Sequence, residues 1–327
     1  MKVAVIGAGV IGITTAYELA TQGHQVSVFE RNGAAAEECS FSNTGVASAG
    51  YAAPWARPGM FKHVLTHLWQ RDTPLRISKL SMADWRWLWQ MRKACDSTTF
   101  ARNRESMLRL AEYSSHRMRT LTDTLNLEHE RSQGFMVLLR SERESRLMQD
   151  SLKVMRDAGL SFKTLSAEEA RNIEPALKPE TALAQAIHFP EDEVGNCRQF
   201  ALLLKNEAES LGVKFHFNTP IEPLSSAQPK TIRIAKQDLG EKFDAVVVCA
   251  GLASAQLVRP LGLRIPLAAV HGYAISASVR EPLDAPRSGV MDEQYKVAIS
   301  RLGQRVRVSG GSEIGGNASR HDAASIK

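Results

Sequence analysis

Hydrophobic positions in the first thirty residues change from the period of a strand to that of a helix and back. Residues 3–6 form an apolar run that enters the glycine-rich sequence 7–12. Apolar residues then recur at helical spacing up to Gln22, and the following Gly23 suits a left-handed helix cap. A second apolar run, residues 25–29, follows at once. The pattern predicts a strand, a helix over residues 10–22 and a second strand.

The same hydrophobic pattern resumes some 200 residues later along the chain. Residues 198–211 form an amphipathic helical pattern closed by Gly212, and residues 213–217 read as a strand. Residues 243–251 are almost continuously apolar up to Gly251, which is typical of a fully buried parallel strand. We therefore expect the opening strands and these later ones to form one sheet. The domain that contains this sheet would then be discontinuous in sequence.

The intervening and final segments predict a second, mixed domain. They contain an expected strand at 134–139, a helix over 141–157 and a capping box formed by Ser166 and Glu169. A strand at 267–277 and a hairpin of residues 295–301 and 305–309 follow. The expected fold class is α/β, with a discontinuous Rossmann-like domain and an inserted α+β domain. The expected ranges are 1–48 plus 186–264 for the first domain, 49–185 plus 265–316 for the second, and 317–327 for an irregular tail.

All five tryptophans lie in a predicted helical insertion, residues 50–130, with arginines interleaved among them. Tryptophan with arginine is typical of a helix at a membrane interface, but the same side chains could pack the insertion onto the core. Core packing is the favoured interpretation. Further along the insertion, one helical face is expected to carry Met107, Leu110, Met118, Leu121 and Leu125.

Length, composition and charge exclude several classes of protein. The 327 residues are 43% hydrophobic and suit two domains, and no apolar run is long enough to span a bilayer. Because the first strand starts by Lys2, no signal peptide is expected, which favours a cytoplasmic protein. The net charge of +6 is spread along the chain without a basic tract, so nucleic acid is not an expected partner. The four cysteines lack metal-site spacing, and no metal is expected.

The sequence Gly7-Ala8-Gly9-Val10-Ile11-Gly12 has the G-x-G-x-x-G spacing of a dinucleotide-binding turn. Gly9 would let the backbone approach a pyrophosphate, and Gly12 would let the helix lie close to the sheet. The unpaired N–H groups at the helix start suit an anion. Glu30 lies 18 residues beyond Gly12, where a carboxylate can accept hydrogen bonds from a ribose. A carboxylate at this position favours an adenosine ribose without a 2′-phosphate.

A polar loop, residues 39–45, replaces the next β-α unit of a nicotinamide-binding domain. Such a loop can wrap a pyrophosphate and approach a flavin ring, although a plain surface loop is the alternative. A nicotinamide-dependent enzyme is the rival of a different class. The residues expected to bind the cofactor are Val3, Ile6, Gly7, Ala8, Gly9, Val10, Ile11, Gly12, Tyr17, Glu30, Arg31, Ser42, Asn43, Ile221, Ala250 and Gly251.

Beyond these features, the chain resembles the D-amino acid oxidase superfamily of flavoproteins, and most closely its bacterial D-amino acid dehydrogenases. The resemblance covers about residues 1–314. Besides the nucleotide motif and Glu30, it rests on the segments 42–45 with 50–55, 187–195, 270–273 and 290–298. It implies that the first domain is the FAD-binding domain and the second the substrate domain. It also implies noncovalent FAD and oxidation of a D-amino acid, D-alanine above all, to a 2-oxo acid and ammonia. Electrons would pass to a quinone or respiratory acceptor, with peripheral contact at the cytoplasmic face of the inner membrane.

The candidate catalytic residues are Tyr51, His271 and Tyr273. Hydride transfer from a neutral amine needs orientation and exclusion of water more than a strong base, so aromatic and carboxylate-binding groups are expected at such a site. A hydrogen-bonded interior histidine is the alternative for His271, and a packed strand residue is the alternative for Tyr295. A glycine- or sarcosine-type amine oxidase of the same superfamily is the alternative activity.

The C-terminal part departs from the family pattern. Family members continue with an Arg-Pro segment, whose arginine binds the substrate carboxylate, and with Gly-His-Gly and Gly-Trp segments against the flavin. From Asn317 the sequence lacks that pattern, as a truncation or a shifted reading frame would produce. Arg301 is the nearest substitute for the arginine and is not expected to reach. The resemblance therefore also predicts a poor catalyst or an inactive truncated flavoprotein.

Overall fold

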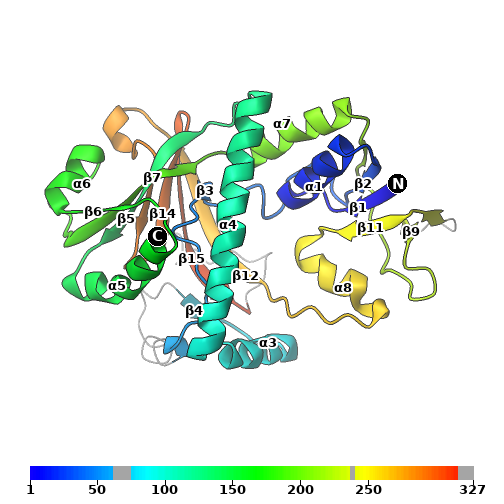
Figure 1. Cartoon of the computed structure of the whole chain (residues 1–327), viewed down its shortest axis with the longest axis horizontal. Helices are drawn as coiled ribbons and strands as arrows, with labels where there is room; N and C mark the ends of the chain where they lie inside the picture. Colours follow the sequence, from blue (N-terminus) through cyan, green and yellow to red (C-terminus); the bar gives the residue numbers. More distant parts are fainter. Residues whose placement is uncertain (62–74, 236–239, 316–327) are drawn as a thin grey trace. The chain divides into compact units, whose positions relative to one another are not determined.

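The computed structural model describes residues 1–61, 75–235 and 240–315. These residues form two units (Figure 1). The first comprises Met1–Asn43, Leu127–His129 and Asn196–Leu267, and the second comprises Thr44–Asn126, Glu130–Gly195 and the chain from Ala268 onward. Both units mix helices with sheets, which agrees with the expected α/β class.

The first unit contains the expected parallel sheet. Its strand order is β11-β1-β2-β8, so two early strands lie between two that come some 200 residues later. The bounds are β1 (Lys2–Ile6), β2 (Gln25–Phe29), β8 (Lys214–His216) and β11 (Ala245–Val248). Helices α1 (Val10–Thr21) and α7 (Cys197–Ser210) contact each other within this unit. The predicted discontinuity of the sheet is thus present in the structure.

One prediction for this sheet is wrong. Residues 243–251 were expected to form a fully buried strand, but all four residues of β11 are only half-buried. The reason is position, because β11 is an edge strand in the described sheet and β1, which is buried from Val3 to Ile6, occupies the interior. The described residues of this unit also contain the β9–β10 pair (Thr231–Arg233 and Gly240–Lys242), helix α8 (Ser254–Val258) and two short 3-10 helices (Gly251–Ala253 and Arg259–Leu261).

A sheet with nine strands in the described residues organises the second unit. Its main path runs β12-β15-β14-β13-β5-β7-β3, with β4 paired to β15 and β6 to β7. The predicted hairpin is confirmed as antiparallel β14 and β15. The strands are β3 (Val46–Ala47), β4 (Leu75–Ile77), β5 (Ser132–Leu139), β6 (Lys163–Leu165), β7 (Gln185–Val194), β12 (Val270–Ser278), β13 (Gly289–Asp292), β14 (Val297–Leu302) and β15 (Arg305–Ile314).

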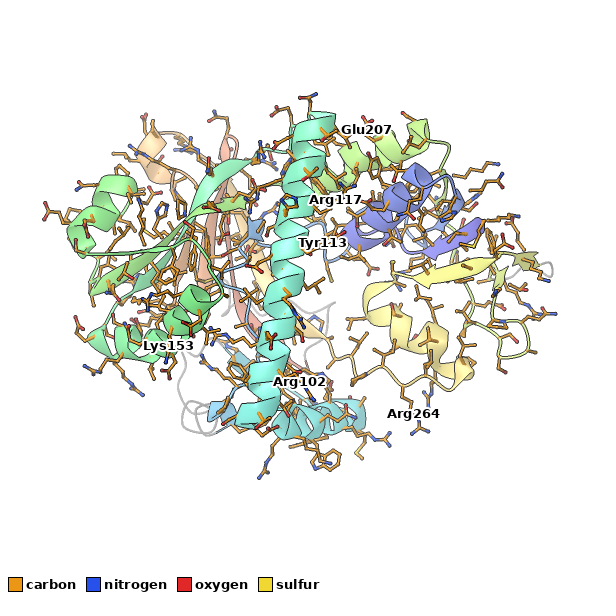
Figure 2. The ribbon with its side chains drawn as sticks, viewed as in Figure 1. Arg102, Tyr113, Arg117, Lys153, Glu207 and Arg264 are labelled. Atoms are coloured by element: carbon orange, nitrogen blue, oxygen red, sulfur yellow. The ribbon has the colours of Figure 1, made fainter. Side chains whose placement is uncertain are left out.

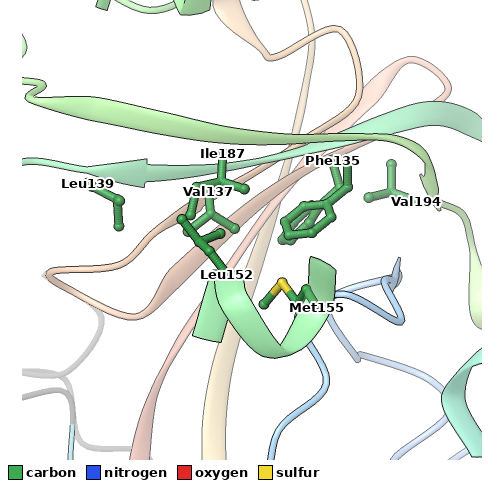
Figure 3. Close-up of a cluster of buried hydrophobic side chains, with 8 residues drawn as sticks. Phe135, Val137, Leu139, Leu152, Met155, Ile187 and Val194 are labelled. Carbon is green, nitrogen blue, oxygen red and sulfur yellow. The ribbon is translucent and has the colours of Figure 1, made fainter. Parts of the chain in front are cut away.

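The helices of this unit are α3 (Met82–Lys93), α4 (Ser97–Leu125), α5 (Glu142–Asp157) and α6 (Ala167–Ile173). Strand β5 is buried on both faces because its alternate side chains enter different clusters. Phe135, Val137 and Leu139 pack with Leu152 and Met155 of α5 (Figure 3). The predicted capping box of Ser166 and Glu169 is present at the start of α6. The apolar run of β5 is thus a central strand with α5 packed on one face and α6 on the other.

The unit boundaries differ from the expected ranges. Residues 44–48 and 186–195 were assigned to the FAD domain, yet β3 and β7 pair with each other in the sheet of the second unit. Residues 127–129 join the first unit instead. Backbone pairing to β5 decides the placement of β7, and no local sequence pattern encodes that pairing.

The favoured interpretation of the tryptophan-rich insertion is also wrong for most of the described tryptophans. Trp55, Trp85 and Trp89 are 54%, 59% and 59% exposed, and only Trp87 is half-buried, while Trp69 lies outside the described residues. On α4, the expected apolar face is confirmed at Leu121, which is buried. Nearer the start of the helix it is shifted, because Met107 and Leu110 are exposed whereas Leu108 is buried. The helix therefore packs along a stripe one residue away from the predicted one at its N-terminal end.

Candidate functional site

The turn between β1 and α1 is closed by backbone contacts that leave no room for side chains. Gly7 has φ +104°, and a Cβ placed on it would lie 2.5 Å from the carbonyl oxygen of Cys249. A Cβ on Gly12 would lie 1.9 Å from the carbonyl oxygen of Gly7. At Gly9 the nearest atom to such a Cβ is the Ser40 hydroxyl, at 3.3 Å. Two of the three glycines therefore allow the turn itself, and the third leaves its backbone open to a ligand.

Glu30 joins this turn from the end of β2. Its carboxylate accepts hydrogen bonds from the N–H groups of Ala8, at 2.8 Å, and Asn32, at 2.9 Å. Ser40 contributes from the polar loop, where its hydroxyl accepts from the N–H of Val10 at 3.0 Å. The first turn of α1 carries N–H groups without partners inside the helix. The first unit thus gathers a carboxylate, a hydroxyl and helix N–H groups around one glycine turn.

The other predicted cofactor residues occupy varied positions. Val3, Ile6 and Tyr17 are buried in the core, while Ile11 and Ser42 are exposed and Asn43 is half-buried. Arg31 is exposed and pairs with Glu38, whose carboxylate it approaches at 2.9 Å through Nε. Ile221 and Ala250 pack against the cluster that contains Phe29 and Phe243, and Gly251 has φ +53° just beyond β11. Their role at a cofactor remains a prediction.

Tyr51 lies in the second unit, where it contacts an ion pair. Its hydroxyl donates to Glu293 at 2.7 Å, and Lys296 both pairs with Glu293 and donates to the Tyr51 oxygen at 3.4 Å. The ring packs edge-on against Phe135, with centroids 5.8 Å apart. Burial first, and then the negative charge of Glu293, raise the pKa of Tyr51 well above its ordinary value. Tyr51 is therefore a neutral hydrogen-bond donor at neutral pH.

His271 and Tyr273 lie on β12, at the other end of the main strand path from β3. In the register with β15, His271 pairs with Glu313, and the Tyr273 hydroxyl donates to the same carboxylate at 3.3 Å. Ser78 also donates to Glu313. The register shifts between His271 and Tyr273, so a β-bulge lies between the two candidates. The candidates Tyr51 and Tyr273 thus each donate to a glutamate that the sequence did not single out.

Comparison with known proteins adds the decisive observation. The family described as FAD dependent oxidoreductase (DAO) matches residues 2–327 of this chain. The chain belongs to this family. The match includes the tail from Asn317, which was expected to fall outside the family pattern. Because the family is FAD-dependent, the nicotinamide-dependent rival is set aside and the protein is an FAD-dependent oxidoreductase.

Two relatives of this chain are both named D-amino acid dehydrogenase. A D-amino acid dehydrogenase of Bradyrhizobium diazoefficiens is 38% identical over 98% of this chain and 77% of its own length. A D-amino acid dehydrogenase of Cereibacter sphaeroides is 40% identical over 97% of this chain and 73% of its own length. The solved glycine oxidase of Geobacillus kaustophilus, 20% identical, superposes with a TM-score of 0.73 over 99% of this chain and 75% of its own. That similarity supports the shared fold.

The first unit of this FAD-dependent oxidoreductase fits the cofactor of its family. The open backbone at Gly9 and the start of α1 suit a pyrophosphate, and Glu30 stands at the end of β2, where a ribose would be bound. Ser40 was not among the predicted residues, although it lies in the polar loop that the sequence marked. Among the described residues, no cluster of metal-binding side chains and no helix able to cross a membrane is found.

Proposed function

We propose that this protein catalyses the oxidative deamination of D-amino acids, with D-alanine as the favoured substrate and a quinone or other respiratory component as electron acceptor. The observation that carries the proposal is the 38–40% identity to two D-amino acid dehydrogenases over nearly the whole chain. The matched region covers 97–98% of the chain and therefore spans both units.

The proposed reaction balances as a two-electron oxidation. The substrate loses a hydride from Cα and a proton from its neutral amine, which yields an imine, and water then hydrolyses the imine to a 2-oxo acid and ammonia. FAD, when bound, supplies the acceptor for that hydride. We propose that Gly9, Ser40, Glu30 and the first turn of α1 hold the cofactor. These groups match a pyrophosphate and a ribose in charge and hydrogen-bonding type.

The residues proposed for the substrate are Tyr51, His271 and Tyr273. Tyr51 is held by Glu293 and Lys296, so its ring and hydroxyl are fixed before substrate binds. Such preorganisation suits a reaction limited by the orientation of a Cα–H bond. Arg301 is not proposed as the carboxylate partner, because its guanidinium donates to the carbonyl oxygens of Gly303 and Pro282, each at 3.3 Å.

The test is turnover by the purified chain reconstituted with FAD. Turnover of D-alanine, L-alanine and glycine is measured with either an artificial dye or dioxygen as the electron acceptor, and the 2-oxo acid formed is quantified. We expect turnover of D-alanine with the dye, and little with L-alanine or with dioxygen. Preference for glycine with dioxygen would support the amine oxidase alternative, and FAD binding without any turnover would contradict the proposed activity.

A further inference from the structure

Helix α3 has two distinct faces. Met91, buried to 8% exposure, and the half-buried Trp87 and Leu88 lie on one side. On the other side Met82, Trp85 and Trp89 are 78%, 59% and 59% exposed. Figure 2 shows α3 at the lower edge of the view with side chains projecting away from the neighbouring elements. The helix therefore presents large apolar side chains to solvent on one face, while the opposite face is buried or half-buried.

The outward face also carries the basic residues of α3. At about 100° per residue, Arg86, Arg92 and Lys93 fall within the same third of the helix circumference as the exposed Met82, Trp85 and Trp89. Lys93 lies over the Trp89 ring at 3.5 Å. The single acidic residue, Asp84, lies on the other side and is engaged in a capping box with Ser81. The face is thus apolar and cationic, without a compensating acid.

We propose that this outward face of α3, formed by Met82, Trp85, Arg86, Trp89, Arg92 and Lys93, is a docking surface for an anionic lipid membrane. Tryptophan favours the boundary between headgroups and acyl chains, and lysine and arginine beside it meet anionic headgroups. A protein partner is less well matched, because lysine is depleted in protein interfaces and a 12-residue helix face is smaller than a stable interface requires. Docking there is independent of the proposed reaction.

The proposal is tested by flotation of the full FAD-loaded protein with lipid vesicles, without any substrate. Vesicles of phosphatidylcholine and phosphatidylglycerol in equal parts are compared with vesicles of phosphatidylcholine alone. We expect binding to the anionic vesicles that added salt reverses. Replacing the three cations (R86Q/R92Q/K93Q) should raise the dissociation constant about 100-fold, since each cation near such a surface contributes roughly fivefold.

A matched control separates this face from the general positive charge of the protein. R143Q/R146Q/K153Q removes the same number of charges from exposed positions of α5 and should leave binding unchanged. W85A/W89A should lose binding to anionic vesicles, whereas W85F/W89F, which keeps aromatic area, should retain most of it. Equal loss in both charge variants, or full binding by W85A/W89A, would overturn the proposal. Self-association that W85A/W89A abolishes, without vesicle binding, would assign the face to a second copy of the chain instead.

Discussion

The Glu30 carboxylate, at the end of β2, accepts a hydrogen bond of 2.8 Å from the N–H of Ala8 in the turn between β1 and α1. A second bond from Asn32 fixes the other carboxylate oxygen. The side chain that would meet the ribose is therefore oriented by the same turn that would meet the pyrophosphate. This connection between the end of one strand and the turn after its neighbour underlies the first prediction.

Replacing Glu30 by glutamine should weaken FAD binding about 10-fold, and replacing it by alanine should weaken it further. Glutamine keeps one acceptor oxygen but loses the charge and the second acceptor, and a hydrogen bond to a charged group is worth about 1.5–3 kcal/mol. FAD fluorescence titration measures the affinity. Glu37→Gln, an exposed neighbour in the same segment, is the control and should bind FAD normally.

Gly12→Ala should abolish FAD binding and destabilise the first unit. Its Cβ would lie 1.9 Å from the carbonyl oxygen of Gly7, so either the helix or the turn must move. Gly33→Ala is the matched control, because its Cβ would come no closer than 3.6 Å to its nearest neighbour, the Asn218 side chain. Bound flavin is read from visible absorbance and stability from thermal unfolding. A Gly12→Ala protein with full flavin content would refute the tight contact of helix and turn.

Tyr51→Phe should lower turnover of the proposed substrate about 10-fold, since it removes the hydroxyl between Glu293 and Lys296. Because burial and Glu293 raise the pKa of Tyr51, the hydroxyl stays protonated beyond pH 10, the ordinary tyrosine value. The ratio of wild-type to variant turnover should therefore remain constant from neutral pH up to that point. Steady-state kinetics across pH tests this, with the exposed Tyr113→Phe as control. A ratio that collapses near pH 10 would show that the hydroxyl ionises.

The contribution of Asp192 to the free energy of unfolding should decrease as the pH rises, which is the opposite of the usual effect of a carboxylate. Burial raises its pKa above 3.8, although a hydrogen bond of 2.5 Å from Ser48 acts the other way. A carboxyl whose folded pKa is raised stabilises the fold below the unfolded pKa and loses that contribution as pH rises through the folded value. The urea concentration at the unfolding midpoint of Asp192→Asn, relative to that of wild type, should therefore rise as the pH is raised from 4 to 7. The exposed Asp157→Asn should show no such trend.

Leu152→Ala should destabilise the second unit by about 2–5 kcal/mol, the usual cost of emptying a packed site. Leu152 is 2% exposed and lies among the side chains of β5 and β7 (Figure 3). Leu147 on the same helix is 71% exposed, so Leu147→Ala should change stability by no more than about 0.5 kcal/mol. Chemical denaturation of the two variants gives the comparison. Equal effects would mean that α5 does not pack as described.

Short-range patterns in the sequence were enough to predict the β1–α1–β2 segment, its glycine turn, the capping box of Ser166 and Glu169, and the β14–β15 hairpin. Each depends mainly on residues close in sequence, as with Gly12, which lies against Gly7, and Ser166, which caps its helix with Glu169. The resemblance of several segments to a flavoprotein family was likewise readable from sequence alone, and the family match confirms it.

Only the tertiary structure decided which residues far apart in sequence meet. The partners Glu293 and Lys296 lie more than 240 residues from Tyr51, and β7 joined the second sheet through pairing to β5. Burial was also decided by the tertiary structure. The edge position leaves β11 half-buried, and on α3 Met91 is buried whereas Trp85 and Trp89 are exposed. Hydrophobicity measures how favourable burial is for a side chain, but the space available beside it depends on elements that the local sequence does not contain.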